Sequence, residues 1–162
     1  MEITKKSGTY RLYTEQFLPV SIESAWDFFS NPINLQKITP SDLNFKIRSF
    51  DNLAAYPGQI ITYSIGINKL LKMNWVTEIT HVQEEKQFVD NQLFGPYKLW
   101  HHVHRFEQRD GGIMMIDIVH FKLPFQLISP ISYNLFVKKK LTKIFQFREE
   151  QLNLLIAKNQ LN

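Results

Sequence analysis

The chain has 162 residues, a mass of 19.2 kDa, a formal net charge of +4 and no cysteine. This length predicts a single domain spanning residues 1–162, and the lack of cysteine excludes disulfides and thiolate chemistry. No window reaches the roughly 18 apolar residues of a membrane span, and residues 1–17 show no signal peptide, so we expect a cytoplasmic protein. The lysines are not interleaved with exposed rings, which argues against a nucleic acid partner. Aromatic residues make up 14% of the chain, which favours a core or pocket lined by rings.

The first part of the chain predicts one strand, two short helices and then a series of strands. Residues 10–18 are rich in strand formers, and Ser21 is a typical helix N-cap before the apolar stripe at residues 25–29. A second helical turn is expected at residues 35–38, before Pro40. Alternating polarity and turn signals then predict strands at residues 43–47, 59–67, 73–79 and 88–94, with a turn at 84–86.

Residues 93–123 predict a long β-hairpin around Arg109-Asp110-Gly111-Gly112. Pairing of Glu107 with Gly112 would place His102 opposite Asp117 and Trp100 opposite Val119. The two-residue period gathers large apolar and ionisable side chains on one face of this hairpin. Such a mixture is typical of a ligand cavity, and also of a hydrogen-bonded polar cluster in an ordinary core. The residues on this face are Trp100, His102, His104, Phe106, Met115, Asp117 and Phe121.

After Pro124 and Pro130, apolar residues from Tyr133 to Leu155 recur at three- and four-residue spacing, which predicts one long amphipathic helix. Lys138, Lys139, Lys140 and Lys143 fall mainly on its other side and indicate a solvated face. A sheet of about seven strands must curl to bury its inner face, and this helix is the natural element to fill it. The element order therefore predicts an α+β helix-grip fold.

This order resembles the SRPBCC superfamily, which includes START, polyketide-cyclase and birch-allergen-like ligand-binding domains, over nearly the whole chain. Several motifs further resemble a bacterial branch of cyclase/dehydrase-like proteins, some described as cell-division inhibitors because relatives are fused to an epimerase-like domain. This chain lacks the Gly-rich fingerprint of such a domain, so the inhibitor role is not carried over. Asn68-Lys69-Leu70 departs from the Gly-Pro type of bend found in relatives. The motifs are FVDNQ at 88–92, GPY at 95–97, Trp100, His102, His104, Phe106, Gly112, Asp117, LP at 123–124 and IFQFR at 144–148.

The length of the turn after residue 94 decides whether Asp90 and Gln92 join His102. A two-residue loop puts them on the opposite face, whereas a three-residue loop puts Asp90 opposite His102 and Gln92 opposite Trp100. We favour the second arrangement because it gathers the polar residues of the motif, and His102 between two carboxylates would have a raised pKa. Arg148 in the C-terminal helix either faces the cavity and holds an anionic group or pairs with a surface acid such as Glu149.

The pair His102-x-His104 with Asp117 could also supply three metal ligands. Strand histidines in such a sheet more often satisfy a neighbouring carboxylate, so we expect no metal and no cofactor. The opposite face of the hairpin carries an apolar strip, which indicates a partner surface such as a homodimer interface, or else a reversed facing. The strip comprises Leu99, Val103, Met114, Ile116 and Ile118.

Three hypotheses follow for the function. The first is binding of a small hydrophobic or amphipathic ligand between the sheet and the C-terminal helix, without assigned catalysis. The second is a cyclase- or dehydrase-type enzyme with His102 as general base, oriented by Asp117 or Asp90. The third is an interaction module with a filled core. The expected ligand-binding residues are Trp75, Asp90, Gln92, Trp100, His102, His104, Phe106, Met115, Asp117, Phe121, Phe145 and Arg148.

Overall fold

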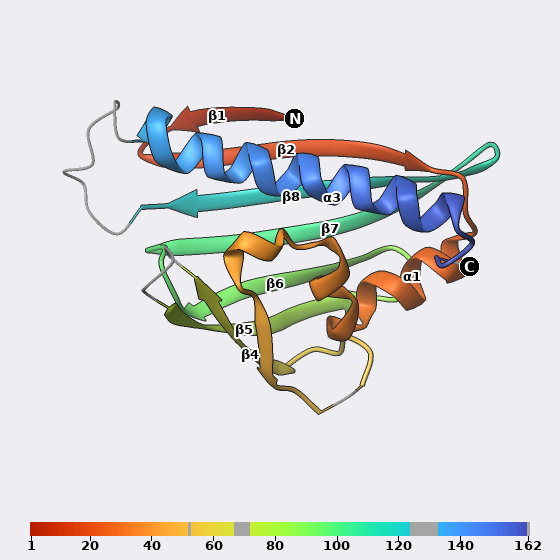
Figure 1. Cartoon of the computed structure of the whole chain (residues 1–162), viewed down its shortest axis with the longest axis horizontal. Coiled ribbons are helices and arrows are strands. Elements are labelled where there is room, and N and C mark those ends of the chain that lie inside the picture. Colours follow the sequence, from red (N-terminus) through yellow and green to blue (C-terminus); the bar gives the residue numbers. More distant parts are fainter. Residues whose placement is uncertain (52, 67–71, 124–132, 162) are drawn as a thin grey trace.

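One curved antiparallel sheet of eight strands, with a long helix across its concave side, forms the frame of the molecule (Figure 1). The computed structural model describes residues 1–51, 53–66, 72–123 and 133–161. The strand order is β1-β2-β8-β7-β6-β5-β4-β3, and the predicted α+β helix-grip fold is confirmed. The elements are β1 (Glu2–Lys6), β2 (Thr9–Leu18), α1 (Ile22–Ser30), η1 (Pro32–Ile38), η2 (Ser41–Leu43), β3 (Lys46–Ser49), β4 (Ile60–Gly66), β5 (Lys72–Gln83), β6 (Gln87–Phe94), β7 (Leu99–Arg109), β8 (Gly112–Lys122), η3 (Tyr133–Lys138) and α3 (Lys139–Ala157).

The N-terminal strand β1 is the element that the sequence pattern did not reveal. Its residues are almost all exposed, so they carry no apolar alternation from which a strand could be recognised. The strand pairs with β2 through a tight turn in which Ser7 and Gly8 both have positive φ, 49° and 76°. The sheet therefore has eight strands where about seven were expected.

The segment between β2 and β3 closes one end of the sheet. The Ser21 hydroxyl accepts a hydrogen bond from the Ser24 N–H at 3.1 Å, which confirms Ser21 as the N-cap of α1. The strand predicted at residues 43–47 is partly wrong, because residues 41–43 form the helical turn η2 and Asn44 has a left-handed φ of 45°. The strand β3 therefore begins at Lys46.

The long hairpin of β7 and β8 is confirmed, but its predicted register is off by two residues. Arg109 pairs with Gly112, so only Asp110 and Gly111 form the loop, and Gly111 has a φ of 77°. His104, rather than His102, therefore lies opposite Asp117, and Trp100 lies opposite Phe121. A shift of two residues keeps every side chain on its expected face.

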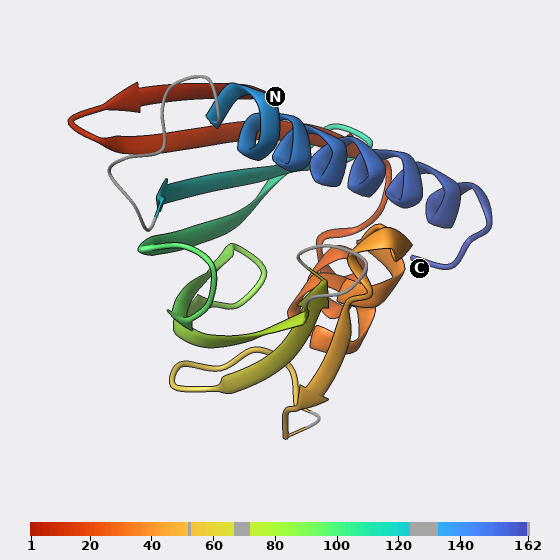
Figure 2. The same ribbon diagram turned by 60° about the vertical axis from the view of Figure 1, so that its left-hand side comes forward.

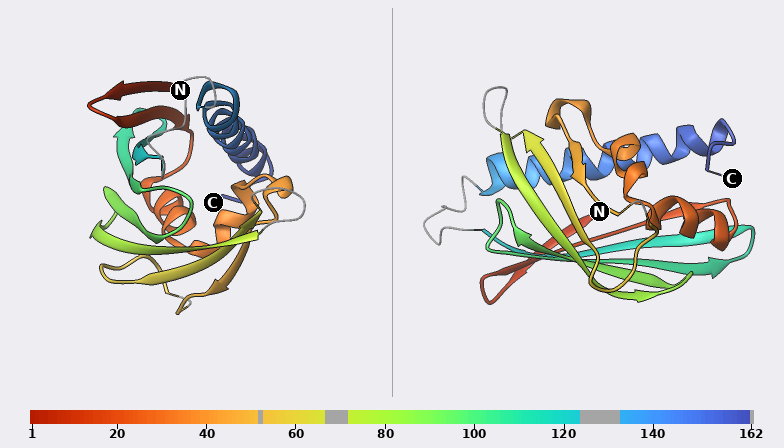
Figure 3. Two further views of the ribbon diagram at one scale, coloured as in Figure 1. Left: turned by 90° about the vertical axis from the view of Figure 1, so that its left-hand side faces the viewer. Right: turned by 90° about the horizontal axis from the view of Figure 1, so that it is seen from below.

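The C-terminal helix lies on the concave side of the sheet, as do α1 and η1 (Figures 2 and 3). The helical segment begins with the π-helical turn η3 and continues as α3, which ends at Ala157. The helix α3 buries Leu141, Phe145, Arg148 and Leu152, which recur at spacings of four, three and four residues. Lys138, Lys139, Lys140 and Lys143 are exposed, as expected for a solvated face.

Two apolar clusters fill the space between sheet and helices. The first surrounds α1 and includes Trp26, Phe29 and Phe106, and the second lies under the first half of α3 and includes Tyr10, Phe121 and Phe145. The motif departure at residues 68–70 lies outside the described residues. Within the described ranges, no helix is long and apolar enough to cross a membrane.

The apolar strip on the convex face of the hairpin is only partly covered, since Val103, Met114 and Ile118 are half-buried. Trp100 and His102 do point to the concave side, so the expected facing is not reversed. Ile116 is only 6% exposed, and its neighbours in the sheet are Glu15 on β2 and Arg105 on β7, whose long stems flank it. Leu99 at the end of the strip is 38% exposed. A homodimer through this face stays a prediction.

Candidate functional site

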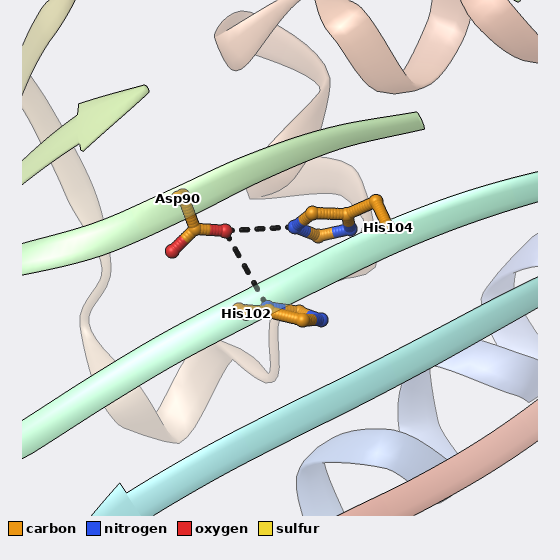
Figure 4. Close-up of side chains that lie close together, drawn as sticks. All are labelled: Asp90, His102 and His104. Carbon is orange, nitrogen blue, oxygen red and sulfur yellow. Dashed lines mark hydrogen bonds and ion pairs between the residues drawn. The ribbon is translucent and has the colours of Figure 1, made fainter. Parts of the chain in front are cut away.

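Five ionisable side chains meet on the concave side of the sheet, and we name them the charged cluster: Asp90 on β6, His102 and His104 on β7, Asp117 on β8 and Arg148 on α3. The sheet register pairs Asp90 with His102 and His104 with Asp117. The pairing of Asp90 is the one predicted for the longer turn after residue 94. Figure 4 shows Asp90 and the two histidines pointing toward one another. All but Asp90 are at most 8% exposed, so the cluster lies inside the fold.

The two histidines bridge the two carboxylates. His102 Nε2 lies 2.9 Å from Asp117 Oδ1, and His104 Nε2 lies 2.8 Å from Asp90 Oδ2, both hydrogen-bond distances. The remaining contacts are longer, with His102 Nδ1 at 3.5 Å from Asp90 and His104 Nδ1 at 3.2 Å from Asp117. The latter is not aligned as a hydrogen bond. Each imidazole therefore donates one firm hydrogen bond and makes one looser electrostatic contact.

The environment moves the pKa values of the two histidines in opposite directions. The raised pKa expected for His102 is wrong, because burial and the neighbouring His104 lower it below its usual 6.5 despite the two carboxylates. Burial also acts against the charged form of His104, but the two carboxylates beside its ring outweigh it and raise its pKa above 6.5. Of the two, His104 is therefore the histidine that more readily carries a positive charge, whereas His102 more readily stays neutral with its proton on Nε2, facing Asp117.

Both carboxylates stay ionised. Burial alone would raise the pKa of Asp117, but Arg148 and the two histidines outweigh it and hold that pKa well below 3.8. Burial also acts against the charged form of Asp90, but the hydrogen bond from His104 and the nearby histidines outweigh it and lower the pKa of Asp90 below 3.8. When His104 is protonated, two carboxylates, one guanidinium and one imidazolium sum to zero charge. This balance reduces the cost of keeping five ionisable groups out of water.

Arg148 connects the charged cluster to the helix. Its Nη1 lies 3.5 Å from Asp117 Oδ1, its Nη2 donates weakly to Met115 Sδ at 3.9 Å, and its Cζ lies 5.4 Å from the centre of the Phe29 ring. It does not pair with the surface acid Glu149, which was the alternative from the sequence. Arg148 therefore faces inward and has fewer acceptors than its five donors could use.

Asp90, His102 and His104 also bring three ligand atoms within 4.8 Å of one another, as a metal site requires. The histidine rings, however, lie face to face with a tilt of 35° and with their centroids only 3.7 Å apart. Two imidazoles that converge on a tetrahedral Zn²⁺ through bonds of about 2.0 Å hold their centroids about 5 Å apart. The rings would have to separate before they could share an ion, so this geometry suits hydrogen bonding better than metal binding.

Partly buried aromatic rings adjoin the charged cluster on one side, and we name Trp75, Tyr97 and Trp100 the aromatic group. The Trp75 and Trp100 rings meet edge to face with their centroids 5.2 Å apart, and the centroid of the Tyr97 ring lies 4.7 Å from that of Trp100. Trp100 in turn contacts the His102 ring at 6.1 Å. The interior therefore changes from partly exposed rings to buried charges over a short distance.

The other predicted site residues lie in different surroundings. Phe145 and Phe121 belong to the apolar cluster under α3, and Phe145 reaches the His102 ring at 6.3 Å. Phe106 packs with Trp26 away from the charged cluster. The Gln92 side chain hydrogen-bonds both the N–H and the carbonyl of Tyr97, so it holds the turn between β6 and β7.

Two residues that the sequence reading missed complete the surroundings of the charged cluster. Phe88 stacks on His104 with ring centroids 4.1 Å apart, and this contact could have been found from the register, since the two residues pair across β6 and β7. Phe29 on α1 covers the Arg148 guanidinium, and no local signal in the sequence predicts that long-range contact.

A small pocket leads from the surface to Asp117 and Arg148 between β2 and α3. Its volume is about 10 Å³, which holds about one water molecule. Anything larger than water therefore needs neighbouring side chains to move before it reaches the charged cluster by this route. The pocket is lined by Thr14, Glu15, Gln16, Met115, Asp117, Phe145, Arg148 and Glu149.

Comparison with known proteins finds similarity in structure alone, since no family model and no curated protein sequence matches the chain. Protein Ms6760 from Mycobacterium smegmatis has a TM-score of 0.66 at 16% identity and covers 98% of each chain. Ara h 8.0201 has a TM-score of 0.59 at 17% identity, with 90% of this chain and 98% of that chain covered. The di-domain ARO/CYC protein StfQ from the steffimycin biosynthetic pathway has a TM-score of 0.69 at 7% identity. The match covers 93% of this chain and 51% of StfQ.

These identities are low, so the similarities establish the fold and nothing finer. The chain shares the helix-grip fold of these structures, so the fold expected from the resemblance to the SRPBCC superfamily is confirmed. Assignment to the cyclase/dehydrase-like bacterial branch stays a prediction.

Proposed function

We propose that this protein binds a small hydrophobic or amphipathic ligand between its sheet and α3, and that the charged cluster holds the polar end of that ligand. The observation that carries this proposal is the placement of five ionisable groups together inside a largely apolar interior. Buried charges are costly, and replacing them by apolar residues is often neutral or stabilising. Their presence beside the partly exposed aromatic group favours a role in recognition over one in stability.

Ligand entry requires movement of side chains. The pocket at Asp117 and Arg148 has room for about one water, but Met115 on its wall is an unbranched and adaptable side chain. The rings of the aromatic group are only partly buried and offer a second approach toward His102. An apolar tail beside these rings and a polar end at the charged cluster would suit an amphipathic molecule.

Native mass spectrometry of the purified protein, followed by denaturing extraction, tests this proposal without a guess at the ligand. We expect a retained lipid, fatty acid or aromatic compound whose mass accounts for the difference between the native and denatured species. A clean apo mass, together with no thermal shift by aliphatic or aromatic acids and alcohols, would contradict ligand binding and favour the interaction module with a filled core.

A cyclase- or dehydrase-type enzyme with His102 as general base is a second candidate. The observation that favours it is the hydrogen bond of 2.9 Å between His102 Nε2 and Asp117 Oδ1, the contact by which a carboxylate orients a histidine base. The free nitrogen of neutral His102, however, faces Asp90 at 3.5 Å. A His102→Gln variant that keeps ligand affinity but loses turnover would support the enzyme, whereas equal loss of both would support binding alone.

A further inference from the structure

One edge of the Arg148 guanidinium has no oxygen acceptor among the described residues. In a guanidinium, the Nε–H and one N–H of Nη2 point in the same direction and form a two-pronged donor. Nη1 faces Asp117, whereas Nη2 contacts the Met115 sulfur at 3.9 Å and Nε has no hydrogen-bond partner. The two-pronged edge is therefore occupied by nothing better than a thioether.

This edge lies in the interior and is held in place. Arg148 is 8% exposed, and the Phe29 ring lies against its guanidinium at 5.4 Å. A buried charged donor without an acceptor is costly. Among the described residues of α3, Arg148 is the cation that contacts Asp117. That contact uses Nη1 alone, so it does not explain why Nε and Nη2 also face the interior.

The surroundings allow an acceptor to reach this edge. Arg148 and Met115 both line the small pocket between β2 and α3, and the flexible Met115 side chain can turn away without loss of backbone structure. The spacing of the two donors matches the two oxygens of a carboxylate, which a guanidinium binds in a bidentate pair. A lone hydroxyl or a carbonyl would use one of the two donors.

We propose that the Nε/Nη2 edge of Arg148 binds the carboxylate of an amphipathic carboxylic acid, while Nη1 stays on Asp117. This inference names the ligand class for the proposed function and rests on that function. The carboxylate displaces the Met115 sulfur and takes the side-on position on the guanidinium. Asp117 keeps its hydrogen bond from His102, so the remainder of the charged cluster is unchanged.

Calorimetric titration with decanoate and with decan-1-ol, which share one tail, tests the proposal. We expect the wild-type protein to bind decanoate at least about tenfold more tightly than decan-1-ol, since a charge-assisted pair is gained. Arg148→Lys keeps the charge but loses the two-pronged edge, so it should weaken decanoate binding about tenfold and change decan-1-ol binding less than about twofold. Arg105→Lys, the same substitution on the exposed face of β7, should leave both affinities unchanged.

The possible failures are distinguishable. Equal affinity of Arg148→Lys and wild type for decanoate, or equal affinity of wild type for both probes, overturns the carboxylate site and leaves ligand binding intact. Binding of neither probe, with no retained molecule in native mass spectrometry, overturns the proposed function together with this inference. If Arg148→Lys does not fold, the ¹⁵Nε–H resonance of wild-type Arg148 decides. The resonance shifts on addition of decanoate but not decan-1-ol if the site is correct, and an unmoved resonance refutes it.

Discussion

The two histidines of the charged cluster are two residues apart on one strand, yet their surroundings shift their pKa values in opposite directions. The pKa of His104 is raised above 6.5 in the folded state. Its contribution to stability is therefore fully present below pH 6.5 and is lost as the pH rises through the folded pKa. The pKa of His102 is lowered, so the unfolded chain takes up this proton first, and stability falls as the pH drops below 6.5.

Glutamine replacements should separate these two effects. In His102→Gln, the free energy of unfolding should decrease as the pH rises from 6 to 8, because His104 is then the one histidine of the charged cluster. In His104→Gln, it should increase with pH between 5 and 7. Each unit of pKa difference is worth about 1.4 kcal/mol, which urea unfolding at a series of pH values resolves. His81→Gln at an exposed position of β5 is the control, and slopes of the same sign in both variants would contradict the assignment.

At this scale the sequence predicted which residues meet but not how they pair. The two-residue period placed His102, His104 and Asp117 on one face, and the choice of the longer turn added Asp90. The partner of each histidine could not be predicted, since it depends on the rotation of the rings in a packed interior. The hydrogen bond from Gln92 to Tyr97 could not be predicted either, because it depends on the geometry of the turn between β6 and β7 in the folded protein.

Among the elements, α3 shows how strictly a helix separates its two sides. Leu152 is 1% exposed and packs in the apolar cluster around α1, whereas Leu154, two positions later, is 50% exposed. Leu152→Ala should lower the free energy of unfolding by about 3 kcal/mol through the cavity that it leaves. Leu154→Ala should change it by less than about 0.5 kcal/mol. Urea unfolding of the two variants checks this, and similar losses would mean that α3 is rotated about its axis.

The start of β8 gives a second prediction at the scale of elements. A Cβ on Gly112 would collide with the Leu18 carbonyl oxygen and lie 2.8 Å from Pro19 Cα, so the end of β2 would have to move. Gly112→Ala should therefore destabilise the fold by at least about 2 kcal/mol. Gly111→Ala meets nothing within 4 Å and pays the cost of a left-handed φ, about 1 kcal/mol. A larger loss of melting temperature in Gly111→Ala than in Gly112→Ala would contradict this order.

The register of the hairpin shows why element boundaries are harder to predict than faces. The expected pairing of Glu107 with Gly112 left Gln108 to Gly111 in the loop, whereas the observed loop contains only Asp110 and Gly111. The period of the side chains did not distinguish the two registers, because either one keeps the same residues inside. The tighter loop uses the positive φ of 77° that Gly111 adopts. For β1 the existence of the strand itself could not be predicted, because its residues are almost all exposed and show no alternation of apolar and polar side chains.

For the whole molecule, the charged cluster lies between two apolar clusters. Phe88 and Phe29 contact it from the apolar cluster around α1, and Phe145 contacts it from the cluster under α3. The ionisable groups, whose burial costs the most free energy, therefore lie in the middle of the core, between the sheet and α3. The overall layout followed from element order alone, whereas this division of the core required the structure.

Stability should be distributed unevenly over the sheet. The strands β7 and β8 pair on both sides at its centre, while β1 and β3 are edge strands whose side chains are mostly exposed. Amide hydrogen exchange should be slowest in β7 and β8 and at least about tenfold faster in β1 and β3. Uniform protection across all eight strands would contradict this picture.

The position of α3 in the chain has a consequence for synthesis. Translation produces all eight strands before residues 139–157, so the concave face of the sheet is made before the helix that covers it. During that interval the aromatic side chains of this face have no partner on α3, and Asp117 has no Arg148 beside it. The nascent chain should therefore complete its core only after the last of these residues has left the ribosome. Until then its exposed apolar surface should be bound by a chaperone that recognises such surfaces.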